Sequence, residues 1–344
     1  MKALTAYLFG WLLVAGTVHA QAPDSPGVFD QDEILQVTIA TDYATLLADI
    51  GEERQQHEGI ISYAENNQTV TVPLKLKTRG KFRRDSSNCN FPPLRLNFAK
   101  KENAATIFRD LDKVKLVTHC QNDNEQYEQY VVQEYLLYRV YNQLSNASFR
   151  VRLLEITYKD TSGKHEPLTT LGFLIEDEEL MAERQKGKVF ESKEIDDPKL
   201  DYEQLTLLYL FEYMIGNIDW SVPIQHNMKL VGKTPKSKIT PVPYDFDHAG
   251  VIDTEYADEA PRIGTASLRY QLFREFCRSE KELKPFFKLF NEKRDMIYEL
   301  YLNQEELTDE TRHRSLRHYK RFYRVINDAE SVKKTFVNPC QQNG

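Results

Sequence analysis

The sequence predicts an α+β protein of two lobes, a strand-rich N-terminal lobe followed by a helix-rich C-terminal lobe. Residues 34–178 hold short alternating strand patterns around one long helical pattern, whereas residues 179–330 are mostly amphipathic or buried helical patterns. The 344 residues leave 324 once a 20-residue leader is removed. Because single cores seldom grow beyond about 250–300 residues, we expect two lobes.

Residues 1–20, "MKALTAYLFGWLLVAGTVHA", predict a signal peptide. Lys2 precedes an apolar run at 6–16 that is short for a membrane span, and Ala20 is the small residue that favours cleavage before Gln21. Retention as an uncleaved anchor is the alternative. We expect an exported protein, periplasmic or extracellular, with a mobile lead at 21–33 and no stable membrane span after cleavage.

Charge and cysteine content agree with export. The formal net charge is -7, and it becomes -8 without Lys2, which argues against general nucleic-acid binding. The four cysteines show no Cys-x-x-Cys spacing, so disulfides are expected in an oxidising compartment. The most local pairing joins Cys89 to Cys120 and Cys277 to Cys340, and the sequence leaves the other two pairings open.

The N-terminal elements follow from period-two patterns and turn signals. A strand at 34–42 precedes a short helix, and Asn66-Asn67 supplies the turn of a hairpin within 57–82. A helical pattern at 127–144 repeats every three or four residues. The remaining expected strands are 93–99, 113–119, 149–160 and 169–177.

The C-terminal elements begin with a helix at 202–215, which Asp201 caps and Gly216 ends. Strands at 228–231 and 238–247 form a hairpin. Helical patterns follow at 266–279, 280–303 and 309–331, with a tail at 331–344. The run "TRHRSLRHYKRFYR" at 311–324 is basic and would suit a polyanion, but its apolar residues keep helical spacing, which favours a solvated basic face.

Polar residues gather around the hairpin of this second lobe. "GNIDWSVPIQHN" at 216–227 carries Asp219, His226 and Asn227, and "YDFDHAG" at 244–250 carries Asp245 and Asp247. The hairpin brings Asn227 close to the two later carboxylates. Carboxylate and amide oxygens are the ligands that Mg²⁺ prefers, and Asp219 is placed to act as a base.

This ordered set is typical of phosphoryl-transfer enzymes, in which a catalytic Asp precedes a metal-binding Asn and a metal-binding Asp. The alternative is structural: Asp219 and Asn227 cap a turn, and the later pair solvates a strand end. For His226 the sequence favours a structural hydrogen bond over a role as base.

The two quoted segments resemble the catalytic segment of the spore-coat protein H (CotH) kinase family. The stretch at 74–98, with "RGKFRRDSSN" and "PPLRLNF", is similar to an early motif of that family. The resemblance implies a bilobal protein-kinase-like fold. It also implies that Asp219 is the catalytic base, that Asn227 binds metal, and that Asp245 or Asp247 is the second metal ligand.

The same resemblance implies ATP and Mg²⁺ (or Mn²⁺) as cofactors and an exported protein or envelope component as acceptor. Lys115 would contact phosphates and Glu134 would hold it, unless these are a solvated strand lysine and a surface-helix glutamate. Asp219 and Asn227 lie eight residues apart, where ordinary kinases have five, and "RGKFRRDSSN" is the one substitute for a glycine-rich loop. A catalytically inactive binding or scaffold protein of the cell envelope is therefore the alternative function.

Overall fold

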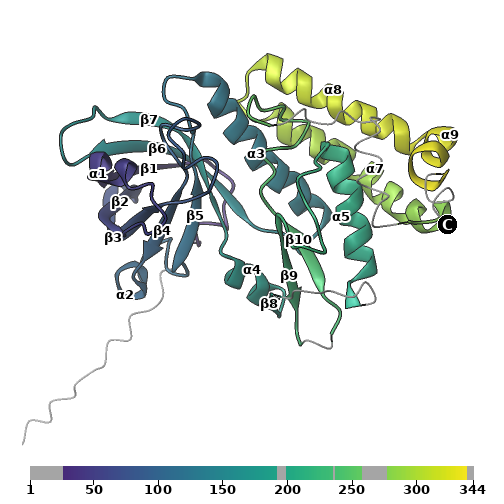
Figure 1. The fold of residues 1–344 in the computed structure, drawn as a ribbon, viewed down its shortest axis with the longest axis horizontal. Coiled ribbons are helices and arrows are strands. Elements are labelled where there is room, and N and C mark those ends of the chain that lie inside the picture. The colour runs from purple at the N-terminus through teal and green to yellow at the C-terminus, as the bar shows by residue number, and fades with distance from the viewer. Residues whose placement is uncertain (1–25, 192–198, 235–236, 258–276, 339–344) are drawn as a thin grey trace, which may run out of the picture.

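The computed structural model describes residues 26–191, 199–234, 237–257 and 277–338. The predicted signal peptide, most of the helix predicted at 266–279 and the end of the tail lie outside these residues. Seven strands form a closed barrel in the order β1-β2-β3-β4-β5-β7-β6 (Figure 1). Their bounds are β1 Leu35–Thr41, β2 His57–Glu65, β3 Gln68–Thr78, β4 Leu94–Phe98, β5 Lys113–Val117, β6 Val151–Asp160 and β7 Leu168–Ile175.

One parallel pairing closes the barrel. All other neighbours in it are antiparallel, but β1 runs parallel to β6, with Leu35 opposite Leu154 and Thr41 opposite Asp160. Strand β6 therefore has a partner on both edges, β7 and β1. Gly172 on β7 permits close packing inside, because a Cβ there would lie 2.8 Å from the Val117 carbonyl oxygen.

The predicted bilobal protein-kinase-like fold is wrong. The N-terminal strands close into a barrel, and the C-terminal part combines a small sheet, in the order β10-β9-β8, with helices. The alternating pattern correctly placed alternate side chains inside, but that pattern is the same for an open sheet and for a barrel. Closure depends on the pairing of β1 with a strand more than one hundred residues later, which no local pattern encodes.

The C-terminal part packs against the barrel through helix α3 (Figure 1). Helix α3 contacts β6 and β7 on one side and α5 and α7 on the other. The long helices are α3 Glu125–Leu144, α5 Tyr202–Ile215, α7 Glu280–Leu302 and α8 Asp309–Ile326. The remaining elements are α1 Tyr43–Ala48, α2 Lys100–Asn103, α4 Glu178–Arg184, β8 Lys188–Phe190, β9 Met228–Gly232, β10 Thr240–Pro243, α9 Ala329–Val332 and the π-helix η2 Lys333–Val337.

Several local predictions are confirmed. Asn66 and Asn67 take φ angles of 50° and 60° in the β2–β3 turn, as a two-residue hairpin requires. The Asp201 side chain accepts hydrogen bonds at the start of α5, and Gly216 ends that helix with φ 72°. Strands β9 and β10 form the predicted antiparallel hairpin. In α8 the apolar positions are buried and most of the basic residues are exposed, but His318 is buried and Arg312 and Arg314 are half-buried.

The predicted disulfide between Cys89 and Cys120 is present. Cys277 is also disulfide-bonded, whereas Cys340 lies outside the described residues. Disulfides of this kind fit an oxidising compartment and hence an exported protein. Within the described segments, no helix combines the length and the apolar character that crossing a membrane requires.

Candidate functional site

Two carboxylates flank a buried phenylalanine just after the β9–β10 hairpin. Phe246 is fully buried, with its ring centre 4.7 Å from that of Tyr138 and 5.4 Å from that of Phe211. The backbone N–H of Asp245 donates to the Tyr138 hydroxyl at 2.9 Å. Packing of Phe246 into the helical core therefore fixes the positions of Asp245 and Asp247 on either side of it.

Arg83 joins these carboxylates to helix α3. It lies in the connection between β3 and β4, and its side chain is only 11% exposed. The guanidinium lies 3.5 Å from Asp245, 3.3 Å from Asp247 and 4.0 Å from Glu134. One buried cation from the barrel thus contacts three carboxylates from the helical part.

Burial and mutual repulsion change the protonation of this group. Burial raises the pKa of Glu134 to about 8; Arg83 opposes that shift, and Asp247 and Asp245 add to it. Burial also raises the pKa of Asp247. Burial alone would lower the pKa of Arg83, but Asp247, Tyr256 and the other carboxylates raise it. The guanidinium therefore stays charged, and burial favours the protonated form of Glu134.

Two further cations lie beside Asp245. Arg79 follows β3 directly, and burial lowers its pKa while Asp245 acts in the opposite direction. Burial lowers the pKa of Lys115 to about 8, Arg79 lowers it further, and Asp245 again opposes the shift. The Lys115 ammonium lies 4.4 Å from the centre of the Tyr244 ring. Both cations are thus partly desolvated and within electrostatic reach of Asp245.

A polar cleft of about 290 Å³ opens beside Lys115, between the barrel and α4. Charged side chains of both signs line it, so it can bind a ligand that carries both acceptors and donors. Its lining residues are Arg95, Lys100, Asp110, Asp112, Lys113, Lys115, Asp177, Glu178, Glu179, Leu180 and Glu183.

Asp219 lies in a closed loop between α5 and β9. A backbone bridge between Ser221 and His226 closes the loop, and the buried Trp220 anchors it. Asp219 Oδ1 lies 2.8 Å from His226 Nε2, and Asn227 Nδ2 donates to Asp219 Oδ2 at 3.0 Å. The Asp219 side chain remains 38% exposed. A positioned carboxylate at this exposure is accessible to a substrate hydroxyl.

Asn227 connects this loop to the paired carboxylates. Its backbone has φ 51°, a conformation that Asn tolerates better than most residues. Its carbonyl oxygen accepts the N–H of Tyr244, the neighbour of Asp245, at 3.1 Å. Its side chain uses only Nδ2 in the bonds to Asp219. The amide oxygen is consequently available near the segment that carries Asp245, just after β10.

A buried glutamate lies beneath the Asp219 loop. Glu212, in the last turn of α5, is 1% exposed, and its carboxyl oxygens have no hydrogen-bond partner among the described residues. Burial raises its pKa to about 8; the neighbouring Asn217 side chain opposes this shift, and the nearby Asp219 adds to it. Asn217 accepts the Asp219 N–H through Oδ1 at 3.0 Å. Glu212 and Asn217 therefore form a largely neutral polar floor under Asp219 at pH 7.

All six predicted site residues lie in one region of the molecule. Glu134, Asp245 and Asp247 meet at Arg83, Asp219 and Asn227 contact each other, and Lys115 lies in the electrostatic field of Asp245. The partner of Glu134 is Arg83, whereas Lys115 lies over Tyr244. Glu134 is 2% exposed, so the surface-helix interpretation of it does not hold.

Sequence reasoning missed Arg79, Arg83 and the tyrosines around them. Both arginines lie in "RGKFRRDSSN", but from the sequence alone this stretch can be described only as a basic segment. Which of its cations would be buried depends on contacts with α3 and the β9–β10 hairpin. Tyr138 carried no functional signal because its helical spacing marked it as a core residue.

The predicted metal ligands are all oxygen donors, but they do not form a closed cage. Among the described residues, no group of three or more His, Cys, Asp or Glu side chains is arranged to hold a metal ion. The carboxylate of Asp245 is 33% exposed and that of Asp247 is 9% exposed. Asp245 is therefore the more accessible of the two carboxylates.

A comparison with protein-family models finds no match, and a comparison with curated proteins finds none either. The resemblance to the CotH kinase family therefore stays a hypothesis that rests on the quoted motifs.

Proposed function

We propose that the protein binds ATP with Mg²⁺ or Mn²⁺ beside Lys115 and transfers the terminal phosphoryl group to an exported protein or envelope component. The observation that supports this most is the juxtaposition of Asp219 and Asn227 with a carboxylate, Asp245, that lies among partly buried cations. Phosphoryl transfer needs positioning and charge stabilisation rather than a covalent group from the protein, and this set supplies both.

Arg79 and Lys115 are the groups suited to bind phosphate. Both are desolvated, so they lose less hydration on meeting an anion than a surface lysine would. An arriving polyphosphate raises the pKa of Lys115 from about 8 and favours its charged form. The cleft of about 290 Å³ beside Lys115 leaves space for the rest of the nucleotide.

Asp219 is the proposed base. It accepts the proton of the acceptor hydroxyl while that oxygen bonds to the terminal phosphorus, and the bridging P–O bond breaks to release ADP. Hydrogen bonds from His226 and Asn227 hold the carboxylate in place for this step. The oxygens of Asn227 and Asp245 would hold the divalent cation, which when bound neutralises phosphate charge.

A second candidate is a protein that binds a phosphorylated ligand without transferring the group. Arg83 favours it, because its guanidinium already contacts Asp245 and Asp247, the proposed metal-binding carboxylates. An exported protein also meets little ATP. In that case the cations beside Asp245 would serve as an anion-binding site.

Thermal unfolding of the oxidised protein, with and without ATP and Mg²⁺ or Mn²⁺, tests nucleotide binding. A ligand of the folded state raises the midpoint by mass action, so we expect a shift that requires the metal. Asp245→Asn removes the charge proposed to hold the cation, so it should abolish the metal-dependent part of the shift in midpoint. The variant should still fold, because Asn tolerates the φ of 66° at this position. The matched control is Asp295→Asn on the exposed face of α7, which should retain the full shift. Absence of any shift with nucleotide would refute both the site and the phosphotransferase.

Transfer of labelled phosphate to envelope proteins separates the two candidates. The phosphotransferase should label an acceptor, and Asp219→Asn should reduce the rate at least about 100-fold while leaving the thermal shift intact. Binding without labelling would leave the ligand-binding function as the answer.

A further inference from the structure

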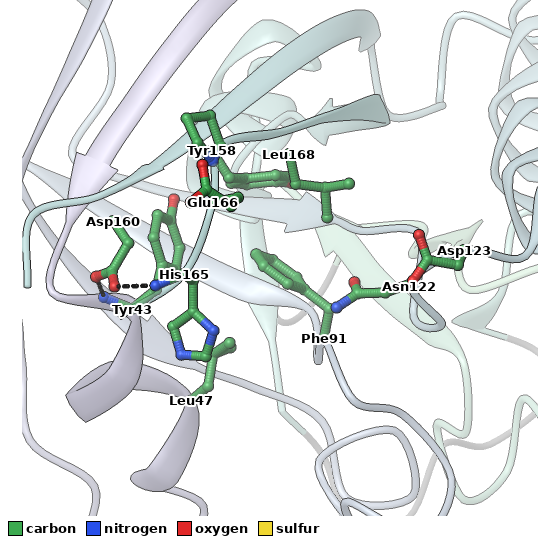
Figure 2. Close-up of a pocket in the computed structure, with 11 residues that line it drawn as sticks. Tyr43, Leu47, Phe91, Asn122, Asp123, Tyr158, Asp160, His165, Glu166 and Leu168 are labelled. Carbon is green, nitrogen blue, oxygen red and sulfur yellow. Dashed lines mark hydrogen bonds between the residues drawn. The ribbon is translucent and has the colours of Figure 1, made fainter. Parts of the chain in front are cut away.

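A cavity of about 310 Å³ opens at the barrel end where β1 and β6 finish and β7 begins (Figure 2). Its walls come from α1, from the β6–β7 connection and from the segment after β5. None of its lining residues belongs to the site described above. The lining residues are Tyr43, Leu47, Phe91, Asn122, Asp123, Tyr158, Asp160, His165, Glu166, Pro167 and Leu168.

Three aromatic rings form the floor of this cavity. The ring centres of Tyr43 and Phe91 lie 5.7 Å apart, those of Tyr43 and Tyr158 lie 5.6 Å apart, and those of Phe91 and Tyr158 lie 4.5 Å apart. Aromatic faces of this kind attract organic cations through their quadrupole and also cover apolar groups. The floor therefore suits a ligand that is compact and either apolar or cationic.

The surrounding chain holds this floor in place. The N–H of Phe91 donates to the Cys120 carbonyl at 3.0 Å, and the Thr118 hydroxyl donates to the Phe91 carbonyl at 3.0 Å. The disulfide from Cys89 to Cys120 ties the same two segments together. The rim is fixed too, since Asn122 donates its N–H to Asn90 at 2.9 Å. A site that is formed before binding loses little entropy when the ligand arrives.

The rim of the cavity is acidic. Asp123, Asp160 and Glu166 line it, and no lysine or arginine is among the residues that do. Asp160 accepts N–H groups from Tyr43 and His165 at 2.9 and 3.0 Å, as the dashed lines in Figure 2 show. Such bonds favour the ionised form of the carboxyl group. The cavity therefore attracts cations and repels phosphates and carboxylates.

One buried hydroxyl at the cavity lacks a partner. Tyr158 lines the cavity at 2% exposure, and its hydroxyl makes no hydrogen bond with the described residues. Buried polar groups are normally paired, so this hydroxyl points to a missing partner. A ligand that carries an N–H or O–H donor would satisfy it.

We propose that this cavity binds a small organic ammonium ion. The aromatic floor receives the cation, the rim carboxylates balance its charge, and the Tyr158 hydroxyl accepts a hydrogen bond from its donor group. The volume accommodates a compact ligand rather than a polymer. This site is independent of the proposed phosphotransferase, because the two share no residue.

Calorimetric titration of the oxidised protein with choline and with ethanolamine tests the proposal. The neutral isostere of choline, 3,3-dimethylbutan-1-ol, differs from it in charge alone. We expect the ammonium compounds to bind at least about fivefold more tightly than the isostere, because the cation–aromatic attraction is lost with the charge. Equal affinity for both, tighter binding of a neutral sugar such as glucose, or no binding at about 10 mM would overturn the proposal.

Variants show whether binding occurs at this cavity. Glu166→Gln removes a rim charge from an exposed side chain and should weaken choline binding about two- to fivefold. Glu305→Gln, an exposed carboxylate in the loop after α7, is the matched control and should leave binding unchanged. Tyr158→Phe removes the unpaired hydroxyl and should weaken ethanolamine more than tetramethylammonium, which has no donor. Unchanged ammonium binding in both Glu166→Gln and Tyr158→Phe would place the ligand elsewhere.

Discussion

Two buried carboxyl groups, those of Glu134 and Glu212, lie close to residues of the candidate site. Glu134 and Glu212 are both almost fully buried, and burial raises the pKa of each to about 8. Glu134 has Arg83 within 4.0 Å, whereas both carboxyl oxygens of Glu212 lack a hydrogen-bond partner among the described residues. The effect of burial on a carboxyl pKa is therefore easier to measure at Glu212, where no cation opposes it, than at Glu134.

Glu212 should make the stability of the protein fall as the pH rises. Its pKa is higher in the folded chain, about 8, than the 4.5 of a free glutamate. Its contribution is therefore fully present below pH 4.5 and is lost as the pH rises to about 8. We expect the free energy of unfolding of the native chain to fall by about 3 kcal/mol more than that of Glu212→Gln when the pH is raised from 5 to 8. Chemical denaturation at both pH values measures this.

The control for this prediction is Glu305→Gln, since Glu305 is exposed in a loop. This variant should follow the native chain at both pH values. If Glu212→Gln also follows the native chain, Glu212 is ionised and solvated in the folded protein, and the neutral floor beneath Asp219 does not exist.

At the scale of elements, the end of α5 positions the Asp219 loop. Gly216 takes φ 72° there, and the N–H of Asn217 donates to the Glu212 carbonyl at 2.9 Å. Asn217 in turn accepts the N–H of Asp219. The helix end and the proposed base are thus linked by two consecutive hydrogen bonds.

We expect Gly216→Ala to lower the free energy of unfolding by about 1 kcal/mol, because an L side chain is strained in the left-handed conformation. The same variant should weaken phosphoryl transfer more than nucleotide binding, as it displaces Asp219 rather than Lys115. Gly51→Ala is the comparison, since a Cβ there meets nothing within 4 Å and its φ is not positive. Equal stabilities of the two variants would contradict the role of Gly216 as helix terminator.

At the scale of the whole molecule, barrel closure and the disulfide together organise the N-terminal part. The barrel has its own hydrophobic core, and a second, larger core joins α3 to the other long helices. The disulfide joins residues 31 positions apart in the sequence. It ties the β3–β4 connection, which also carries Arg83, to the segment just after β5. Its loss should therefore loosen the barrel end and the arginine together.

Replacing both Cys89 and Cys120 by Ala should lower the free energy of unfolding by about 3 kcal/mol, because the closed loop restricts the unfolded chain. Choline binding should fall as well, since the disulfide ties the segment that carries Phe91 to the segment after β5. Denaturant titration and calorimetry of the variant measure the two effects. A loss below about 1 kcal/mol would mean that barrel packing alone holds these segments.

Much of the local structure could be predicted from the sequence. Asn66 and Asn67 predict the β2–β3 turn, and Asp201 and Gly216 predict the two ends of α5. The β9–β10 hairpin follows from two short strand patterns separated by a loop. These features depend on backbone preferences of single residues and on short-range periodicity. The Cys89–Cys120 bond also follows from the most local pairing in an oxidising compartment.

The sequence by itself determined the residue types of the candidate site and the segments that carry them, since Asp219, Asn227, Asp245 and Asp247 lie close together along the chain. Only the tertiary structure decided the fold, the burial of Arg83 against three carboxylates, and the ammonium cavity. Each of these depends on segments about fifty to more than one hundred residues apart, such as β1 with β6 or Arg83 with Glu134. Periodicity shows which side of a segment is buried, but the partner it is buried against is fixed only when the whole chain packs.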